Sequence, residues 1–317
     1  MNVPVFDLHC DTALALLGEN FRSCGSLRNN DLHIDLIRAS VLKHYVQCFA
    51  CFTTTPECSD FGVSPVDLFE RELATIHREL EKNSDLIAQA YTMEDIETNA
   101  QNGKMSAVLS IEGPAGFGFD PELLEDLYQV GFRITTLGWN EKNPLTGSHK
   151  TGGGLTDIGK AYVKEAQRLG MIIDVSHISD EGFWDIVNIT QAPIIASHSN
   201  SRTICGHSRN LTDDMFRAIC ETGGVVGFNQ YAGFVGDPAD LDMACSHILH
   251  FISMDPEAKH IALGADMDGC DQLTSGMRGV QDYPGFAETL YQYGLSNDMI
   301  YNIFWNNAMG VMKRCCM

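Results

Sequence analysis

The chain has 317 residues, 44% of them hydrophobic and 20% charged, so it can bury a large core and carries no signature of disorder. Its 42 Asp and Glu residues outnumber its 21 Lys and Arg residues, and the net charge of −21 argues against binding to nucleic acid or anionic membranes. The N-terminus lacks a basic and apolar export pattern and no apolar run approaches the ~20 residues of a membrane span, so we expect a cytoplasmic protein.

Eight apolar segments rich in β-forming residues follow one another along the chain. They cover residues 3–8, 45–52, 106–111, 133–137, 171–176, 193–197, 224–228 and 261–265. Near-continuous apolar character is typical of strands that are buried on both faces, as in a parallel sheet.

Segments with helical periodicity lie between these strands. Thr156 can cap a helix that Gly170 ends, Ser179 or Asp180 begins another, and Thr212 caps a third. Longer helices are predicted over residues 65–83 and 298–315. The repeated alternation predicts a (β/α)8 TIM-like barrel that forms a single domain over residues 1–317. A doubly wound sheet is disfavoured, since no glycine-rich turn follows the first strand.

Metal-ligand residue types stand at the carboxyl ends of five predicted strands, where barrels build their active sites. These residues are His9, Asp11, Glu112, His177, His198 and Asp266. Alternation along a strand puts His9 and Asp11 on one face. Each histidine taken singly is more often a hydrogen-bonded core or surface residue than a metal ligand. Together the six would be costly to bury, unless they satisfy one another through a metal ion.

A near repeat of the first motif occurs at residues 31–35. Its histidine, His33, follows the polar segment 28–30 rather than a buried strand. We therefore interpret His33 as part of a loop or helix start and leave it out of the metal site.

Histidine and carboxylate ligands suit Zn²⁺, with Mn²⁺ or Fe²⁺ as alternatives. Five ligands exceed the three of a mononuclear catalytic zinc, so we predict two Zn²⁺ ions that share Glu112. His9 and Asp11 would hold one ion, and His177 and His198 the other. Two such ions ~3.5–4 Å apart can share a hydroxide that acts as the nucleophile. No Ser or Cys nucleophile is then needed, and the sequence has no Gly-x-Ser-x-Gly elbow.

The chain resembles the membrane (renal) dipeptidase family within the amidohydrolase-like metal barrels. The matching motifs arrive in the family's order and cover residues 7–12, 111–113, 174–177, 197–199, 208–211 and 264–269. The resemblance implies the same five metal ligands, with Glu112 bridging. It also implies that Arg209 grips the free carboxylate of the substrate and that Asp266 is the acid–base. Asp268 is the competing assignment, with a role as a loop hydrogen bonder as its alternative.

The chain departs from the family pattern after the fourth predicted strand. Trp139 stands where many members have a histidine that polarises the scissile carbonyl, and Asn140 follows it as a donor for the developing oxyanion. We predict that both contact the substrate. Phe52 and Phe234 replace tyrosines and indicate a more apolar pocket. His149, in a glycine-rich stretch, could reach the barrel mouth, but we interpret it as a solvated loop residue.

The sequence therefore predicts a metallo-dipeptidase that acts through a metal-bridging hydroxide on dipeptides, including those with a D-configured C-terminal residue. One alternative is a related binuclear amidohydrolase that acts on N-acyl amino acids, lactams or lactones and does not depend on Arg209. The other is a non-catalytic metal-binding protein. The expected partner is a small dipeptide, without nucleic acid or membrane, and the resemblance implies a homodimer.

Overall fold

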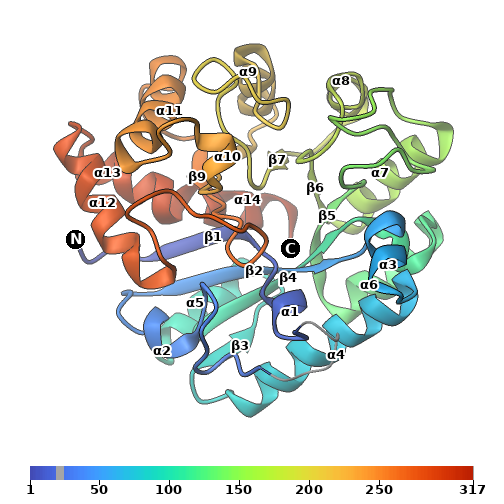
Figure 1. The fold of residues 1–317 in the computed structure, drawn as a ribbon, viewed down its shortest axis with the longest axis horizontal. Coiled ribbons are helices and arrows are strands. Elements are labelled where there is room, and N and C mark those ends of the chain that lie inside the picture. Colours follow the sequence, from blue (N-terminus) through green and yellow to red (C-terminus); the bar gives the residue numbers. More distant parts are fainter. Residues whose placement is uncertain (19–24, 317) are drawn as a thin grey trace.

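Parallel strands close into a barrel at the centre of the molecule (Figure 1). In the computed structural model, which describes residues 1–18 and 25–316, eight strands form the ring in the order β2-β1-β9-β8-β7-β6-β5-β4, and β4 pairs with β2 to close it. They are β1 (Val5–Cys10), β2 (Tyr45–Phe52), β4 (Met105–Glu112), β5 (Phe132–Thr136), β6 (Ile172–Asp174), β7 (Ile194–Ala196), β8 (Val225–Phe228) and β9 (Ile261–Leu263). The predicted (β/α)8 class is thus confirmed, and the eight apolar segments coincide with these strands to within a few residues.

One further strand, β3 (Ile87–Gln89), was not predicted. It pairs with residues 105–107 of β4, on the edge that β5 occupies further along, and so lies outside the ring. Two of its three residues are only half-buried, and three residues are too few to show a period.

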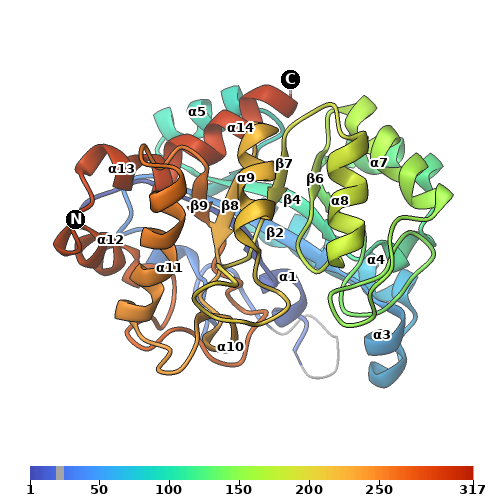
Figure 2. The same cartoon turned by 90° about the horizontal axis from the view of Figure 1, so that it is seen from above.

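Helices surround the barrel, as Figure 2 shows from above. They are α1 (Thr12–Ala15), α2 (Leu36–Ala39), α3 (Thr55–Phe61), α4 (Pro65–Lys82), α5 (Met93–Gln101), α6 (Leu124–Val130), α7 (Asp157–Leu169), α8 (Asp180–Ile189), α9 (Asp213–Glu221), α10 (Ala232–Val235), α11 (Leu241–Met254), α12 (Tyr283–Gln292), α13 (Asn297–Tyr301) and α14 (Asn307–Cys315). Short 3₁₀ turns cover Pro114–Phe117, Pro121–Leu123 and Val280–Asp282, and a π-helical turn, Asn302–Asn306, joins α13 to α14.

The predicted caps are present. Thr156, Ser179 and Thr212 each accept a hydrogen bond from a backbone N–H of the helix that they begin, and Gly170 ends α7 with φ +86°. In the described part of the chain, no helix combines the length and the apolar character that a membrane crossing requires.

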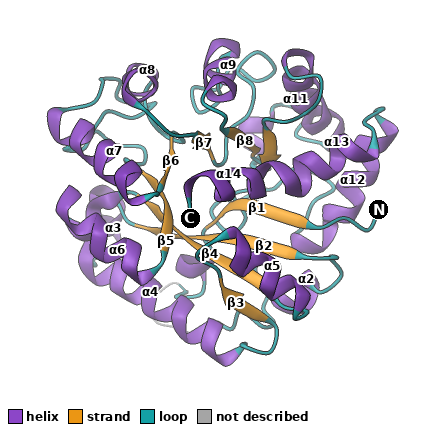
Figure 3. Cartoon of the chain, turned by 180° about the vertical axis from the view of Figure 1, so that it is seen from behind, coloured by secondary structure: helices purple, strands orange, loops and turns teal. Residues whose placement is uncertain are grey.

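The C-terminal helix covers one end of the barrel (Figure 3). One apolar core unites residues of α14, among them Ala308 and Met312, with side chains that all eight barrel strands contribute, such as Phe6 of β1 and Val108 of β4. Because α14 covers this end, the predicted site residues have room only at the opposite end, where the strands finish.

A register irregularity in β1 directs the first two candidate ligands. Asp7 pairs with Gln47 of β2 but Cys10 pairs with Phe49, so β1 has one residue more than its partner over this stretch. Such a bulge reverses the alternation of faces. Cys10 accordingly belongs to the outer core, whereas Phe6 and Leu8 belong to the inner one. The bulge turns His9 and Asp11 toward the barrel axis.

Candidate metal centre

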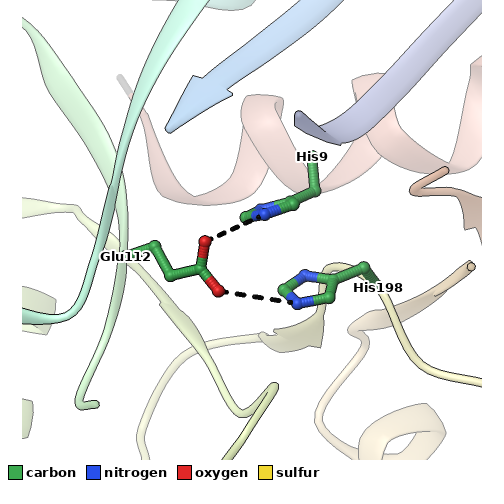
Figure 4. Close-up of side chains that lie close together, drawn as sticks. All are labelled: His9, Glu112 and His198. Carbon is green, nitrogen blue, oxygen red and sulfur yellow. Dashed lines mark ion pairs between the residues drawn. The ribbon is translucent and has the colours of Figure 1, made fainter. Parts of the chain in front are cut away.

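Glu112, at the end of β4, lies between two groups of ligand-type side chains (Figure 4). Its Oε2 is 3.1 Å from Nε2 of His9, on β1. Its Oε1 is 3.0 Å from Nε2 of His177 and 3.8 Å from Nε2 of His198, which follow β6 and β7. The two oxygens of one carboxylate therefore face opposite sides, which is the arrangement that a shared metal ligand requires.

On the His9 side, carboxylates gather around the imidazole. Its Nε2 is 3.4 Å from Oδ2 of Asp11 and 3.9 Å from Oδ1 of Asp266, which follows β9. The donor atoms of these three residues lie within 4.8 Å of one another. Gly269 makes this crowding feasible, because a Cβ there would stand 2.0 Å from Asp11 Oδ2 and 2.5 Å from Asp266 Oδ1.

Burial makes these groups costly unless a cation satisfies them. The exposed fractions of His9, Glu112 and His198 are 2%, 3% and 1%. Within the described residues, His9 Nε2 and Asp11 Oδ1 have no hydrogen-bond partner. A buried polar atom without a partner costs about 1–3 kcal/mol. The mixed nitrogen and oxygen donors fit a divalent cation such as Zn²⁺.

The hydrogen bonds of His198 leave its Nε2 free to bind a metal. Asp174 accepts the hydroxyl proton of Ser197, so Ser197 Oγ must accept the hydrogen bond from His198 Nδ1 at 2.7 Å. A neutral imidazole has one N–H, so Nε2 carries a lone pair. This lone pair faces His177 Nε2 at 2.8 Å, a contact that needs a proton or a cation nearby.

The pKa shifts differ between the two sides of Glu112. Burial, and then the charge of Arg209, keeps the pKa of His177 well below its usual value; burial, and then His9, does the same for His198. Burial also opposes a charge on His9, but Glu112 and Asp11 outweigh it and hold the pKa of His9 well above its usual value. Burial raises the pKa of Glu112 to about 8 and that of Asp266 to about 6. Burial thus disfavours the negative charges of Glu112 and Asp266, which a divalent cation would compensate.

Backbone strain is concentrated at the same place. His177, Asp266 and Asp268 have φ of 69°, 61° and 67°, a region that residues other than glycine rarely adopt. Such strain costs on the order of 1–3 kcal/mol per residue and clusters at functional sites.

Asp266 and Asp268 have different surroundings. Asp266 Oδ2 accepts a hydrogen bond from Asn229 Nδ2 at 3.1 Å, which leaves Oδ1 on the His9 side. Asp268 accepts hydrogen bonds from Thr12 Oγ1 and from the backbone N–H of His33, each at 2.6 Å. The chain therefore occupies both oxygens of Asp268. His33, outside the predicted metal set, contributes to holding this residue.

A pocket of about 520 Å³ opens above the cluster. Trp139 and Asn140 line it, as do Phe52 and Phe234. The ring of Trp139 packs edge-on against Phe52, with centroids 5.2 Å apart. His149 also lines the pocket, half-buried and hydrogen-bonded, so the alternative that it reaches the barrel mouth is correct, and the preferred interpretation as a solvated loop residue is not. The loop after β5 folds back over the barrel mouth, which spacing along the chain does not reveal.

Arg209 lies beside this pocket rather than on its wall. It is 4% exposed and borders a second, much smaller cavity next to His177. Its guanidinium donates to Ser199 Oγ and to the carbonyl of His198, both at 3.2 Å, and lies 5.3 Å from the centre of the Phe234 ring. Among the described residues no carboxylate forms an ion pair with it. Burial lowers its pKa to about 10.

The roles of several residues of the site could not be recognised from the sequence. Asn229 binds Asp266, while Asp174 and Ser197 support His198. Asp174 and Ser197 belong to motifs noted above, but their role depends on which strands are neighbours. Gly269 also stands in a motif, although only the folded chain brings it against two carboxylates.

Comparison with known proteins identifies the family of the chain. The family model of membrane dipeptidase, peptidase family M19, matches residues 1–316. An uncharacterised dipeptidase of Schizosaccharomyces pombe is 32% identical over 303 residues, which is 89% of this chain and 72% of that protein.

Two solved structures share the fold. A Rhodobacter sphaeroides metallopeptidase, crystallised with a phosphinate mimic of the dipeptide L-Ala-D-Ala, superposes with a TM-score of 0.90 at 23% identity, over 99% of this chain and 100% of that one. The dipeptidase AC, a metallopeptidase of family M19, gives a TM-score of 0.87 at 23% identity, over 100% and 99%. The chain therefore belongs to the membrane dipeptidase family, peptidase family M19, and the metallo-dipeptidase function predicted from its sequence is confirmed at the level of that family.

Proposed function

We propose that the chain is a binuclear zinc dipeptidase in which Glu112 bridges the two ions. His9 and Asp11 would complete one site, and His177 and His198 the other. The observation that carries this proposal is the orientation of Glu112, whose Oε2 faces His9 and whose Oε1 faces His177 and His198. Mn²⁺ and Fe²⁺ suit the same donors.

When bound, the two cations would activate a shared water molecule and polarise the scissile carbonyl. The chain supplies the rest of the chemistry. Asp266 Oδ1, on the His9 side of the cluster, accepts the proton of the attacking water and passes it to the leaving amine. Asn229 holds the other oxygen of Asp266 and so keeps Oδ1 directed at the reacting atoms.

Arg209 binds the terminal carboxylate of the dipeptide. A buried guanidinium without an acidic partner is suited to this role, because it can form two parallel hydrogen bonds with a carboxylate. Trp139, Phe52 and Phe234 give the pocket apolar walls for side chains, and Asn140, which also lines the pocket, would offer its amide nitrogen to the substrate. A pocket of about 520 Å³ suits a molecule of dipeptide size.

The proposed substrates include dipeptides with a D-configured C-terminal residue. The Rhodobacter sphaeroides relative was crystallised with a mimic of L-Ala-D-Ala, which supports this extension. A cytoplasmic location and a homodimer stay predictions.

A dipeptide panel, assayed on metal-analysed protein with and without a chelator, tests the proposal. We expect hydrolysis that the chelator abolishes and that added zinc restores, with turnover of both L-Ala-L-Ala and L-Ala-D-Ala. Strict selectivity for L-Ala-L-Ala would contradict the proposal that dipeptides with a D-configured C-terminal residue are substrates. Protein that holds no metal and cleaves no dipeptide would favour a non-catalytic role.

The position of Arg209 behind the main pocket favours one alternative, an amidohydrolase that acts on N-acyl amino acids, lactams or lactones. Such an enzyme would share the metals but would not need Arg209. An Arg209→Ala variant separates the two functions. A dipeptidase should show a large rise in KM, whereas unchanged activity on the best substrate would identify the amidohydrolase.

A further inference from the structure

A chain of hydrogen bonds runs from the surface of the barrel mouth to His177. Ser208, in the loop between β7 and α9, is bonded through its Oγ to His149 Nδ1 at 2.8 Å. His149 Nε2 lies 2.8 Å from Asn140 Oδ1, and the same oxygen lies 3.0 Å from His177 Nδ1. Asn140 and His149 both belong to the loop between β5 and α7. We call these four residues the His177 relay.

One arrangement of protons satisfies the whole relay. An amide oxygen only accepts, so His177 Nδ1 and His149 Nε2 must both carry hydrogen. His149 Nδ1 then accepts from the hydroxyl of Ser208. A neutral His177 that is protonated at Nδ1 has its lone pair at Nε2, the atom 3.0 Å from Glu112 Oε1. This tautomer is the one that a metal ion at Glu112 would need.

Hydrogen bonds that involve the backbone fix the position of the relay relative to His177. The N–H of His149 donates to the carbonyl of His177 at 2.9 Å, and Ser148 Oγ donates to the carbonyl of Asn140 at 2.8 Å. His177 itself has a φ of 69°, so its ring direction is not one that the strand end would adopt by default. The loop and the ligand therefore constrain each other.

We infer that Asn140 and His149 are positioning residues for metal binding, with Asn140 acting on His177 directly and His149 acting through Asn140. This inference rests on the proposed role of His177 as a ligand. The expected contact of Asn140 with the oxyanion would use its amide nitrogen and stays a separate prediction, because the oxygen that the two histidines share can only accept. The corresponding support of His198, Ser197 and Asp174, lies inside the barrel and is buried, whereas Asn140, His149 and His177 line the substrate pocket.

The test compares Asn140→Leu, which removes the acceptor at similar volume, with Asn140→Asp, which keeps an acceptor oxygen. Long-range ¹H–¹⁵N spectra of ¹⁵N-histidine-labelled, metal-free protein report the tautomer of each imidazole. We expect His177 to be protonated at Nδ1 in wild type and in Asn140→Asp, and to lose this preference in Asn140→Leu. His198 should keep its tautomer in all three proteins and so reports that the barrel is intact.

Zinc affinity gives a second readout. In titrations against a competing chelator, Asn140→Leu should weaken one of two zinc sites by about 10–100-fold and leave the other within a few-fold, as loss of a hydrogen-bond partner of a ligand does elsewhere. Asn140→Asp should recover most of the affinity. His149→Ala should cost less than Asn140→Leu. An unchanged tautomer and two wild-type sites in Asn140→Leu, or equal loss in the Leu and Asp variants, would overturn the inference.

The tautomer experiment needs neither metal nor substrate. If the chain proved to cleave no dipeptide, the spectra would still show whether Asn140 sets His177. Conversely, a dipeptidase whose Asn140→Leu variant keeps the wild-type tautomer would retain the proposed function and lose only the relay.

Discussion

The two sides of Glu112 carry different kinds of ligand-type residues. On one side, His9 and Asp11 lie two residues apart at the end of β1, and Asp266 adds a second carboxylate. On the other side, His177 and His198 come from two strands, and each has its Nδ1 held by a hydrogen-bonded partner. The His9 side therefore has several charged groups and few hydrogen bonds. The two histidines on the other side are neutral, and each has a hydrogen-bond partner at Nδ1.

This difference suggests that the two sides would bind a cation in different ways. Carboxylates near His9 favour the binding of a cation, and one of them is Asp266, the proposed acid–base. The two neutral histidines opposite can bind a cation only if their lone pairs are aimed at it, so their support must come from outside the cluster. We therefore expect substitutions on the two sides to fail in different ways.

Glu112→Gln should have the largest effect, because both sides depend on this residue. An amide cannot present an anionic oxygen to each side. We expect both metal ions to be lost and activity to fall by more than the roughly 10–100-fold that loss of a supporting partner costs. Metal analysis together with kcat measures this, and Glu94→Gln, at an exposed position on α5, is the control. Retention of both ions would exclude a bridging role.

Asp266→Asn should lower kcat by about 10²–10⁴-fold while both metal ions stay bound. Asp268→Asn is the matched control. Since Asp268 binds Thr12 and the backbone of His33, its loss should reduce the free energy of unfolding by about 1–3 kcal/mol and leave kcat within tenfold. If Asp266→Asn lost a metal ion instead, Asp266 would be a ligand of the His9 side and not the acid–base.

Metal removal should destabilise the fold, because the charged side is then left uncompensated. If the free concentration of the metal is 100 times its Kd, removal of each bound ion by a chelator should lower the free energy of unfolding by about 2.7 kcal/mol. Urea unfolding of wild type with and without the chelator measures this change. Glu112→Gln should be almost insensitive to the chelator, and an equal response in both proteins would mean that the ions bind elsewhere.

A buried histidine outside the metal cluster gives a pH dependence that can be tested separately. His247, on α11, accepts from the backbone N–H of Ser201 and donates to the carbonyl of Val235, and burial lowers its pKa to about 4. The unfolded chain binds this proton near pH 6.5, so stability is lost as the pH falls from about 6.5 toward 4.

At pH 5 this loss should amount to about 2 kcal/mol relative to pH 8. His247→Gln should abolish that part of the pH dependence. Urea unfolding of the metal-free wild type and variant at both pH values gives the comparison. Identical pH profiles would show that His247 does not carry the effect.

The fold was largely predictable from the sequence. Strand segments buried on both faces are apolar throughout, and caps such as Thr156 and Gly170 mark the helices locally. The short strand β3 was missed because it lies outside the ring and is only partly buried. His149 was misjudged because a glycine-rich loop can fold in many directions, and packing over the barrel mouth selects one of them.

The sequence by itself determined which residue types stand at the strand ends, since the parallel barrel brings those ends together whatever the loops do. Only the tertiary structure decided how the groups face one another. The bulge in β1 aims His9 and Asp11, Glu112 divides its two oxygens between the sides, and Asn140 forms a hydrogen bond with His177. These contacts join segments far apart in the chain, and hydrogen bonds of about 3 Å depend on distances that residue order does not encode.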